Sequence, residues 1–134
     1  MTFRELHGLD LRISYADTDP AGILYFGAWF PWMERVQTEW LFLRGFRQDT
    51  LEERFGWRTI TRAAECEYLA PVRLFDPIHV GLGIGHLGTT SLRWELRMTR
   101  DGELVGRGSM TLVTTDASGV PVAVPAALRT LVAE

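Results

Sequence analysis

The sequence predicts a single α+β domain in which an antiparallel sheet wraps around one long, buried helix. Three observations predict it: an apolar helical pattern from about residue 27 to 44, four alternating strand patterns after Trp57, and one alternating pattern ahead of the helix. The chain has 134 residues, of which 46% are hydrophobic, and a chain of this length can bury roughly two-thirds of its unfolded surface in one core. We therefore expect residues 1–134 to form one domain.

The first predicted elements are a strand and a tight loop. From Leu9 to Tyr15, apolar residues at odd positions alternate with polar ones, which is the period of a half-buried strand. Turn-forming residues are then concentrated between Asp17 and Gly22, and Pro20 disfavours helical backbone at Asp19. A loop is therefore expected between this strand and the long helix.

The long helix is predicted by apolar residues at positions 29, 30, 33, 36, 40, 41 and 43. Proline is tolerated only in the first turn of a helix, so Pro31 puts the start near Ala28 to Phe30. Gly45 stands where a C-terminal cap is expected. This helix has a broad apolar face and needs a sheet to cover it.

The remaining elements are a short helix closed by Gly56, four consecutive strands and a terminal helix that begins near Pro125. The short helix is expected at residues 51–55 and the terminal helix within 120–134. The four strands are expected at residues 64–68, 78–84, 92–98 and 104–115. A single sheet curled around a helix covers only one of its own faces and leaves its edge strands unpaired. We therefore expect a homodimer in which edge strands pair across a twofold axis.

Composition and charge exclude several classes of function. The 14 basic residues are all scattered arginines and face 17 acidic residues, so the basic footprint of a nucleic-acid-binding protein is missing. Without lysine, neither Schiff-base chemistry nor a P-loop is available. The longest uncharged stretch, Pro20 to Met33, is too short to span a membrane, and residues 1–10 lack the apolar core of a secretory signal. We expect a cytoplasmic protein with no nucleic-acid or membrane partner.

Metal and cysteine chemistry find little support. The three histidines, His7, His79 and His86, do not stand at zinc-motif spacing with Cys66, so neither a metal nor a cofactor is predicted. The single cysteine cannot form an intramolecular disulfide and fits a reducing compartment. A spatial pairing of Cys66 with His79 or His86 stays open, although a buried strand cysteine is the favoured interpretation.

Two other patterns have simpler structural interpretations. The glycines from Gly83 to Gly88 match a dinucleotide-binding fingerprint, but a strand pattern follows where that fingerprint needs a helix. We interpret them as positions where another backbone or helix packs closely. Glu65 and Glu67 are interpreted as a solvated strand face. Core packing is the favoured role, and an aromatic ligand pocket the alternative, for Trp29, Phe30, Trp32, Trp40 and Phe42.

The loop before the long helix carries the sharpest functional signal. Asp19 stands immediately ahead of a helix whose first amides, from Phe26 through Ala28, have no acceptor inside the helix. Such amides and the helix dipole can bind an oxyanion within reach of a loop carboxylate. A carboxylate beside an oxyanion site can hydrolyse an acyl group, either by direct attack or by deprotonating water. The alternative is that Asp17 and Asp19 only cap the turn and the helix.

At these residues the sequence resembles the hotdog-fold thioesterases of the 4-hydroxybenzoyl-CoA thioesterase family. The matching signature is Tyr15-x-Asp17-Thr-Asp19-Pro-Ala-Gly22-Ile-Leu-Tyr25-Phe, followed by Trp32, Glu34, Arg35 and the block Thr38-Glu-Trp-Leu41. The residue-specific part of the resemblance covers about positions 13 to 46. The resemblance implies a hotdog fold, in which an antiparallel sheet wraps around one long central helix.

The resemblance also implies roles for individual residues. Asp19 takes the place of the catalytic carboxylate, as nucleophile or general base. The backbone N–H groups of Phe26 and Gly27 take the place of the donors that polarise the thioester carbonyl. Asp17 then orders the turn. The residues assigned to substrate binding are Tyr25, Trp29 and Glu34.

The chain departs from the family at two places. Relatives of the Tol-Pal-associated type carry a histidine directly after the motif tyrosine; this chain has Phe26, so only the backbone amide can act there. The hydroxybenzoyl enzyme carries basic residues in the strand turn that meets the CoA phosphates, a region that corresponds to Gly88-Thr-Thr90 here. Guanidinium groups bind phosphate well, and the candidate contacts are Arg58, Arg62, Arg73 and Arg93.

The expected function is therefore that of an acyl-CoA thioesterase, acting without a cofactor on an acyl- or aroyl-CoA or on an acyl carrier protein thioester. The expected assembly is a homodimer or homotetramer, with the pocket at the dimer interface, between the helix start of one subunit and the strands of the other. The alternative is a non-catalytic acyl-thioester binding or interaction subunit on the same fold. A hotdog dehydratase is a weaker alternative, because that chemistry needs a histidine close to Asp19.

Overall fold

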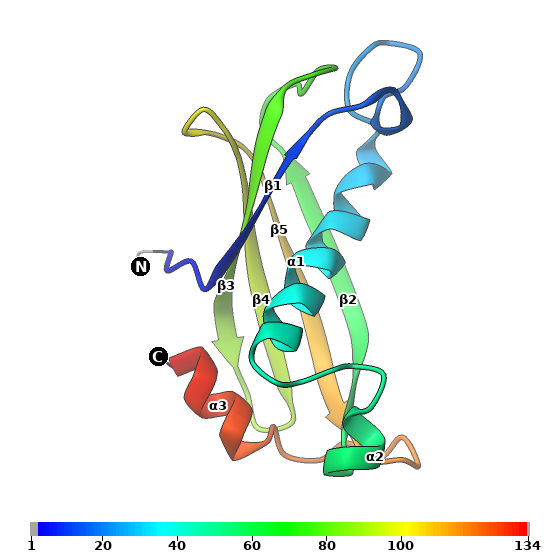
Figure 1. Cartoon of the computed structure of the whole chain (residues 1–134), viewed down its shortest axis with the longest axis vertical. Helices are drawn as coiled ribbons and strands as arrows, with labels where there is room; N and C mark the ends of the chain where they lie inside the picture. Colours follow the sequence, from blue (N-terminus) through cyan, green and yellow to red (C-terminus); the bar gives the residue numbers. More distant parts are fainter. Residues whose placement is uncertain (1–2, 134) are drawn as a thin grey trace.

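The computed structural model describes residues 3–133, which contain one five-stranded antiparallel sheet and three α-helices (Figure 1). The outermost positions of the predicted domain, residues 1, 2 and 134, lie outside the described residues. The strands are β1 (His7–Arg12), β2 (Arg58–Tyr68), β3 (Pro77–Leu87), β4 (Ser91–Arg100) and β5 (Glu103–Thr115). The helices are α1 (Trp29–Leu43), α2 (Leu51–Phe55) and α3 (Ala126–Ala133).

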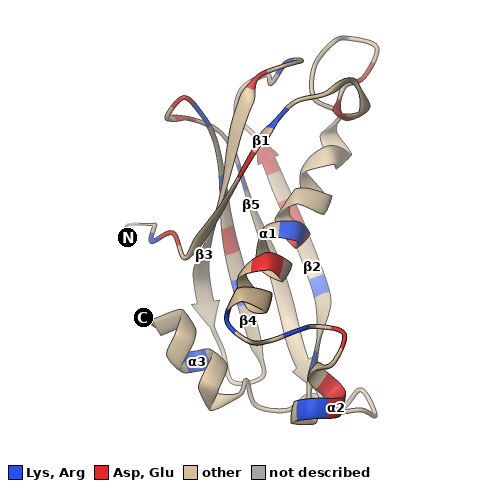
Figure 2. Ribbon diagram, in the orientation of Figure 1, with Lys and Arg blue, Asp and Glu red and all other residues tan. Residues whose placement is uncertain are grey.

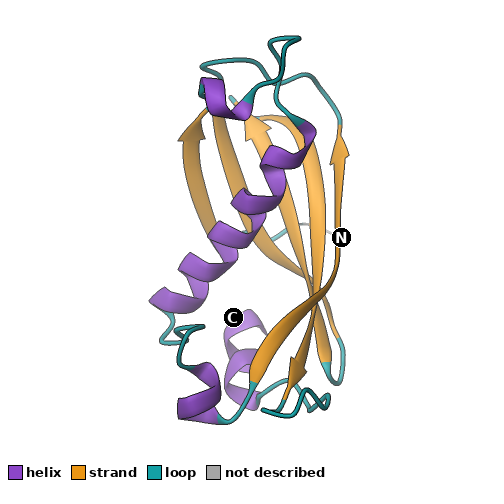
Figure 3. Cartoon of the chain, turned by 90° about the vertical axis from the view of Figure 1, so that its right-hand side faces the viewer, coloured by secondary structure: helices purple, strands orange, loops and turns teal. Residues whose placement is uncertain are grey.

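The sheet has the strand order β1-β3-β4-β5-β2, so β1 and β2 form its two edges. Helix α1 lies along one face of the sheet (Figure 3), as the sequence predicts. The start of α1 lies near the loop that precedes it, at one end of the molecule, whereas α2 and α3 lie at the other end (Figure 1). This arrangement is the α+β hotdog fold.

Helix α1 begins and ends where the sequence predicts. It starts at Trp29, which places Pro31 in the first turn, where its missing N–H costs no helical hydrogen bond. It ends at Leu43, and Gly45 follows with a φ of 91°, a left-handed conformation that favours glycine. The residues that face the sheet recur at spacings of three and four, and the buried ones are Trp29, Met33, Val36, Gln37, Trp40 and Leu41.

The bounds of two strands differ most from the prediction. Strand β2 begins at Arg58, six residues ahead of the predicted 64–68, and the first strand ends early. The alternation predicts a strand from Leu9 to Tyr15, but β1 ends at Arg12 and residues Tyr15–Asp17 form a 3-10 turn. The Asp17 carboxylate accepts hydrogen bonds from the Ser14 backbone N–H at 2.9 Å and from the Ser14 hydroxyl at 3.1 Å. These local bonds favour a turn over the continued strand, so the prediction is wrong for its last residues.

Glycines on the outer face of β3 lie beneath the chain segment that precedes β1. A Cβ atom added at Gly83 would stand 2.6 Å from the Phe3 ring and 2.7 Å from the Arg4 carbonyl oxygen. Gly81 has no space for a Cβ either, because the Glu5 side chain occupies it. The interpretation of close backbone approach is therefore confirmed at Gly83, whereas the space at Gly81 is filled by a side chain, and a Cβ at Gly85 or Gly88 would stand 3.1 Å or more from its nearest neighbours.

Charged residues are interspersed along the strands and helices, but the first turn of α1 carries none (Figure 2). No helix among residues 3–133 is long and apolar enough to cross a membrane. The uncharged start of α1 is the region that the sequence singles out as a functional site.

Candidate active site

A pocket of about 400 Å³ lies where the start of α1, the preceding loop and the end of β2 meet. Most of its wall is apolar, and Asp19 supplies the one carboxylate among the lining residues. The residues that line it are Asp19, Ile23, Leu24, Phe26, Trp29, Tyr68, Leu69, Ala70, Pro71 and Val72. The structure thus brings three sequence-predicted site residues, Asp19, Phe26 and Trp29, to one cavity.

Asp19 is held in the loop by its backbone on both sides. Its N–H donates to the Ile23 carbonyl at 3.0 Å, and its carbonyl accepts from the Gly22 N–H at 2.9 Å. Gly22 has a φ of 77°, which a glycine adopts without steric cost. One carboxylate oxygen, Oδ1, accepts from the Ala21 N–H at 2.9 Å, and no hydrogen bond to Oδ2 is found within residues 3–133. The side chain is therefore oriented while one oxygen stays available for a ligand or water.

Asp17 has a different role in the same loop. Its carboxylate caps Ser14, and its backbone carbonyl accepts from the Tyr25 N–H at 2.7 Å. Asp17 thereby fixes both ends of the loop that carries Asp19, which agrees with the ordering role expected for it.

Fewer backbone N–H groups lack an acceptor at the start of the helix than the sequence predicts. Three free N–H groups are expected, from Phe26 through Ala28, but the Ala28 N–H donates to the Tyr25 carbonyl at 3.0 Å. This bond closes a 3-10 turn over Phe26–Ala28, directly ahead of α1. For Phe26 and Gly27 the described part of the chain offers no acceptor to the N–H group, so these two remain as candidate oxyanion donors. Phe26 lines the pocket, whereas the predicted site residue Gly27 lies next to it in the chain and is not itself a lining residue.

Aromatic rings surround these two amides. The Tyr25 ring lies 4.7 Å from the Phe26 ring, and a Cβ at Gly27 would stand 2.7 Å from Tyr25 Cε1. Trp29 is only 1% exposed, and its ring centroid lies 5.2 Å from that of Tyr68. The predicted substrate-binding residue Trp29 therefore lines the pocket, whereas Tyr25 packs beside the amides and is not itself a lining residue.

Glu34 does not reach this pocket in the single chain. It lies exposed on α1, where its carboxylate accepts from Gln37 Nε2 at 3.2 Å and from the Thr38 hydroxyl at 3.1 Å. Its assignment to substrate binding stays a prediction.

Sequence reasoning missed Tyr68 and the Leu69–Val72 segment. Tyr68 is the last residue of β2, and its hydroxyl donates a hydrogen bond to the Phe26 carbonyl. The alternating pattern predicts a strand that ends at this residue, but only the sheet order brings the end of β2 to the start of α1. A tyrosine at the end of a predicted strand is the one signal that the sequence offered.

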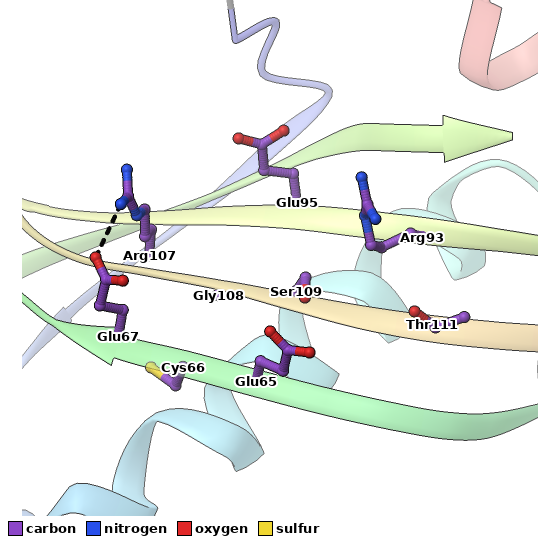
Figure 4. Close-up of a pocket in the computed structure, with 9 residues that line it drawn as sticks. All are labelled: Glu65, Cys66, Glu67, Arg93, Glu95, Arg107, Gly108, Ser109 and Thr111. Atoms are coloured by element: carbon purple, nitrogen blue, oxygen red, sulfur yellow. Dashed lines mark ion pairs between the residues drawn. The ribbon is translucent and has the colours of Figure 1, made fainter.

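The Cys66 and histidine alternatives find no support. Cys66 is half-buried, and burial raises the pKa of its thiol to about 11. It lines a shallow hollow on the outer side of the sheet, where Glu67 and Arg107 form an ion pair at 2.9 Å (Figure 4). A pairing of the Cys66 thiol with His79 is excluded, because both ring nitrogens of His79 are bonded to the carboxylates of Asp10 and Glu5. The solvated face predicted for Glu65 and Glu67 is confirmed.

His79 is bonded to two carboxylates, away from the pocket. Its Nδ1 lies 2.7 Å from Asp10 Oδ1, and its Nε2 lies 2.9 Å from Glu5 Oε1. Partial burial disfavours the charged ring, but the hydrogen bonds to Asp10 and Glu5 outweigh it and raise the pKa of His79. Neither His79 nor His86 lines the pocket that holds Asp19, so the condition set for the dehydratase alternative is not met.

The fold and the pocket define a hotdog domain with a carboxylate beside a helix start. The model of the thioesterase-like superfamily matches residues 13–131, and the chain belongs to this family. The acyl-CoA thioester hydrolase YbgC of Escherichia coli O6:H1 is 31% identical over 108 residues, which cover 79% of each chain.

Solved structures are similar over nearly the whole chain. A thioesterase from Thermus thermophilus, complexed with coenzyme A and Zn, is 28% identical with a TM-score of 0.80, covering 96% of this chain and 92% of that one. A 1,4-dihydroxy-2-naphthoyl-CoA thioesterase from Synechocystis is 17% identical with a TM-score of 0.85, covering 96% of each chain. The second similarity supports the fold alone.

Proposed function

We propose that the protein hydrolyses the thioester bond of an acyl-CoA, with Asp19 as the catalytic carboxylate. The observation that carries this proposal is a pocket lined both by Asp19, which keeps one carboxylate oxygen available, and by Phe26, whose N–H group, like that of the adjacent Gly27, has no acceptor within residues 3–133. The names of the E. coli relative and of the coenzyme A complex support CoA as the carrier.

The arrangement can perform the two tasks of thioester hydrolysis. The N–H groups of Phe26 and Gly27 stabilise the negative charge that develops on the carbonyl oxygen. Asp19 either accepts a proton from a water that attacks the carbonyl carbon or attacks that carbon itself. The carbon–sulfur bond then breaks, and the CoA thiolate leaves and is protonated. A mixed anhydride formed by direct attack is hydrolysed by a second water.

The pocket suits an apolar acyl or aroyl group. Trp29 and Tyr68 supply flat aromatic surfaces, and Ile23, Leu24 and Val72 supply aliphatic ones. Among the candidate arginines, Arg73 directly follows the lining residue Val72 and forms a β-bridge with Ile23. Arg73 is therefore the arginine that we propose for a CoA phosphate. Arg58 lies 3.6 Å from Glu52 instead.

We further propose that the active unit is a homodimer or a dimer of dimers. Within the described chain strand β2 has one neighbour, β5, so its other edge is open to a second chain. The pocket borders the end of this edge through Tyr68 and Leu69, and a second copy paired along β2 would complete its wall. A cytoplasmic location belongs to this proposal, since the lone Cys66 fits a reducing compartment.

The test is thiol release from a panel of short-chain, long-chain and aroyl-CoA substrates, with Asp19→Asn in parallel. The substitution keeps the size of the side chain and the acceptor for the Ala21 N–H, so the fold is expected to persist while turnover falls by about a hundredfold or more. Equal turnover by both proteins would exclude the catalytic role of Asp19. Tight CoA binding without any turnover, including on carrier-protein thioesters, would favour the non-catalytic binding subunit.

A further inference from the structure

We propose that Tyr68 is a positioning residue that sets the direction of the Gly27 N–H group. This inference rests on the proposed function, because it concerns one of the two donors assigned there to the thioester oxygen. Tyr68 comes from β2, about forty positions further along the chain, and its hydroxyl donates to the carbonyl oxygen of Phe26.

The geometry of the peptide bond couples the Phe26 carbonyl to the Gly27 N–H group. The C=O of Phe26 and the N–H of Gly27 belong to the same planar unit, and in a trans peptide they point in opposite directions. A hydrogen bond that fixes the carbonyl therefore also fixes the N–H. A donor on the carbonyl further polarises the peptide unit and strengthens its N–H as a donor.

The preceding peptide, between Tyr25 and Phe26, is fixed in the same way, but by a backbone donor. The Tyr25 carbonyl accepts from the Ala28 N–H at 3.0 Å, which orients the Phe26 N–H. Both candidate donors are thus oriented from their carbonyl sides. Both peptides belong to the 3-10 turn of Phe26–Ala28, and the second is held in addition by the tyrosine hydroxyl, which a single substitution can remove.

Gly27 explains why such a bond is needed. A Cβ at this position would stand 2.7 Å from Tyr25 Cε1, so the Tyr25 ring would have to move. Glycine restrains the backbone less than any other residue, so the 3-10 turn around Gly27 gains from a further bond to the preceding peptide. The bond from Tyr68 counteracts this freedom at the peptide whose orientation matters.

The Tyr68 ring is itself held in place. It packs on Trp29 at 5.2 Å between ring centroids, with an interplanar angle of 53°. Trp29 in turn occupies the space above Gly106, where any Cβ would collide with the indole ring. Gly106 is the residue directly opposite Tyr68 in the β2–β5 register. A chain of contacts from β5 through Trp29 therefore supports the hydroxyl.

The test compares wild type with Tyr68→Phe, which removes the hydroxyl and keeps the ring on Trp29. We expect kcat to fall about tenfold or more, since loss of a complete oxyanion donor costs about 100- to 1000-fold, with KM changed less than about twofold. The control is Thr130→Val in α3, which removes another hydroxyl that donates to a backbone carbonyl, at 3.0 Å, far from the pocket. It should leave both constants unchanged.

A second measurement does not depend on activity. The ¹⁵N and ¹H chemical shifts of the Gly27 amide should move in Tyr68→Phe, because the preceding carbonyl loses its donor, while the thermal unfolding midpoint stays close to that of wild type. An active wild type with unchanged kcat in Tyr68→Phe would overturn the positioning role. If the wild type itself shows no turnover, the proposed function fails, and an unmoved Gly27 amide would then separately overturn the inference about Tyr68.

Discussion

Two carboxylates of the same loop, Asp17 and Asp19, have separate tasks because only Asp19 lines the pocket. Both bonds from Ser14 fall on Oδ2 of Asp17, and the bond from Ala21 falls on Oδ1 of Asp19, so each carboxylate keeps one oxygen without a partner within the described chain. The two bonds of Asp17 stabilise the turn. Asp19, which shares the pocket with the helix start, is the carboxylate suited to accept a proton or attack a carbon there.

The role of the Phe26 backbone N–H can be tested with a proline. Phe26→Pro removes this donor, which has no acceptor within the described chain, so no internal hydrogen bond is lost. Tyr25 has φ −65° and ψ 130°, an extended conformation that a following proline tolerates, and a helix start tolerates proline itself. We expect a folded protein whose kcat falls by about 100-fold, measured by thiol release alongside circular dichroism.

The matched control for this prediction is Phe26→Leu, which keeps the N–H and an apolar side chain. Its kcat should stay within about threefold of wild type, because the proposed donor is the backbone. A proline variant with the turnover of the leucine variant would exclude the Phe26 N–H as a donor.

The sequence identified part of this site because local signals sufficed for it. Asp19 and Phe26 stand in one loop and helix start, where the turn formers and the helix pattern are contiguous. Tyr68 carried no comparable signal, since its contact with Phe26 depends on β2 lying at the sheet edge beside α1. The acceptor for the Ala28 N–H was missed as well, because a 3-10 turn ahead of an α-helix is not visible in apolar periodicity.

At the scale of elements, α1 and strands β3 to β5 were predictable because each has a strong period and is bounded by residues that interrupt it, whereas only the part of β2 from Ala64 to Tyr68 was predicted. The bounds of α1 follow from Pro31 and Gly45, and the hairpin between β4 and β5 follows from Asp101 and Gly102, both at positive φ. The order of the strands was not predictable from these patterns. Pairing partners are set by tertiary packing, and β2 lies next to β5 although two strands separate them in sequence.

The segment before β1 is attached to the sheet by a pH-dependent contact. Glu5 and the β1 residue Asp10 both bond the ring of His79 on β3, and together they raise the pKa of His79 above its ordinary value of 6.5. A raised pKa means that the folded state binds the proton more tightly than the unfolded state. The stabilisation is therefore complete below about pH 6.5 and is lost as the pH rises through the folded pKa.

We accordingly expect His79→Gln to lower the thermal unfolding midpoint at about pH 6 more than at about pH 9. Wild type should lose part of its stability over this range, and the variant should lose less. Scanning calorimetry of both proteins at the two pH values measures this difference. The same drop at both pH values would show that the ring contributes by packing and not by its charge.

At the scale of the whole molecule, the pocket of a single chain lies next to an unpaired edge of the sheet, strand β2. Strand β2 spans eleven residues, and most of its side chains are exposed, in contrast to β3 and β4. Long unpaired edges are rare in soluble proteins unless another chain covers them. Because Tyr68 and Leu69 stand where this edge meets the pocket, assembly and activity are expected to be coupled.

The last prediction tests this coupling. Lysine on an edge strand discourages pairing with another chain, so Ile60→Lys in β2, where the side chain is 44% exposed, should shift a dimer towards monomer and lower specific activity. Val120→Lys is the matched control, since Val120 is 54% exposed in the turn after β5 and does not belong to the edge strand, and it should change neither. Light scattering after size exclusion gives the mass, and thiol release gives the activity. A fully active wild-type monomer at micromolar concentration would contradict the shared pocket, because each chain would then hold a complete site without its partner.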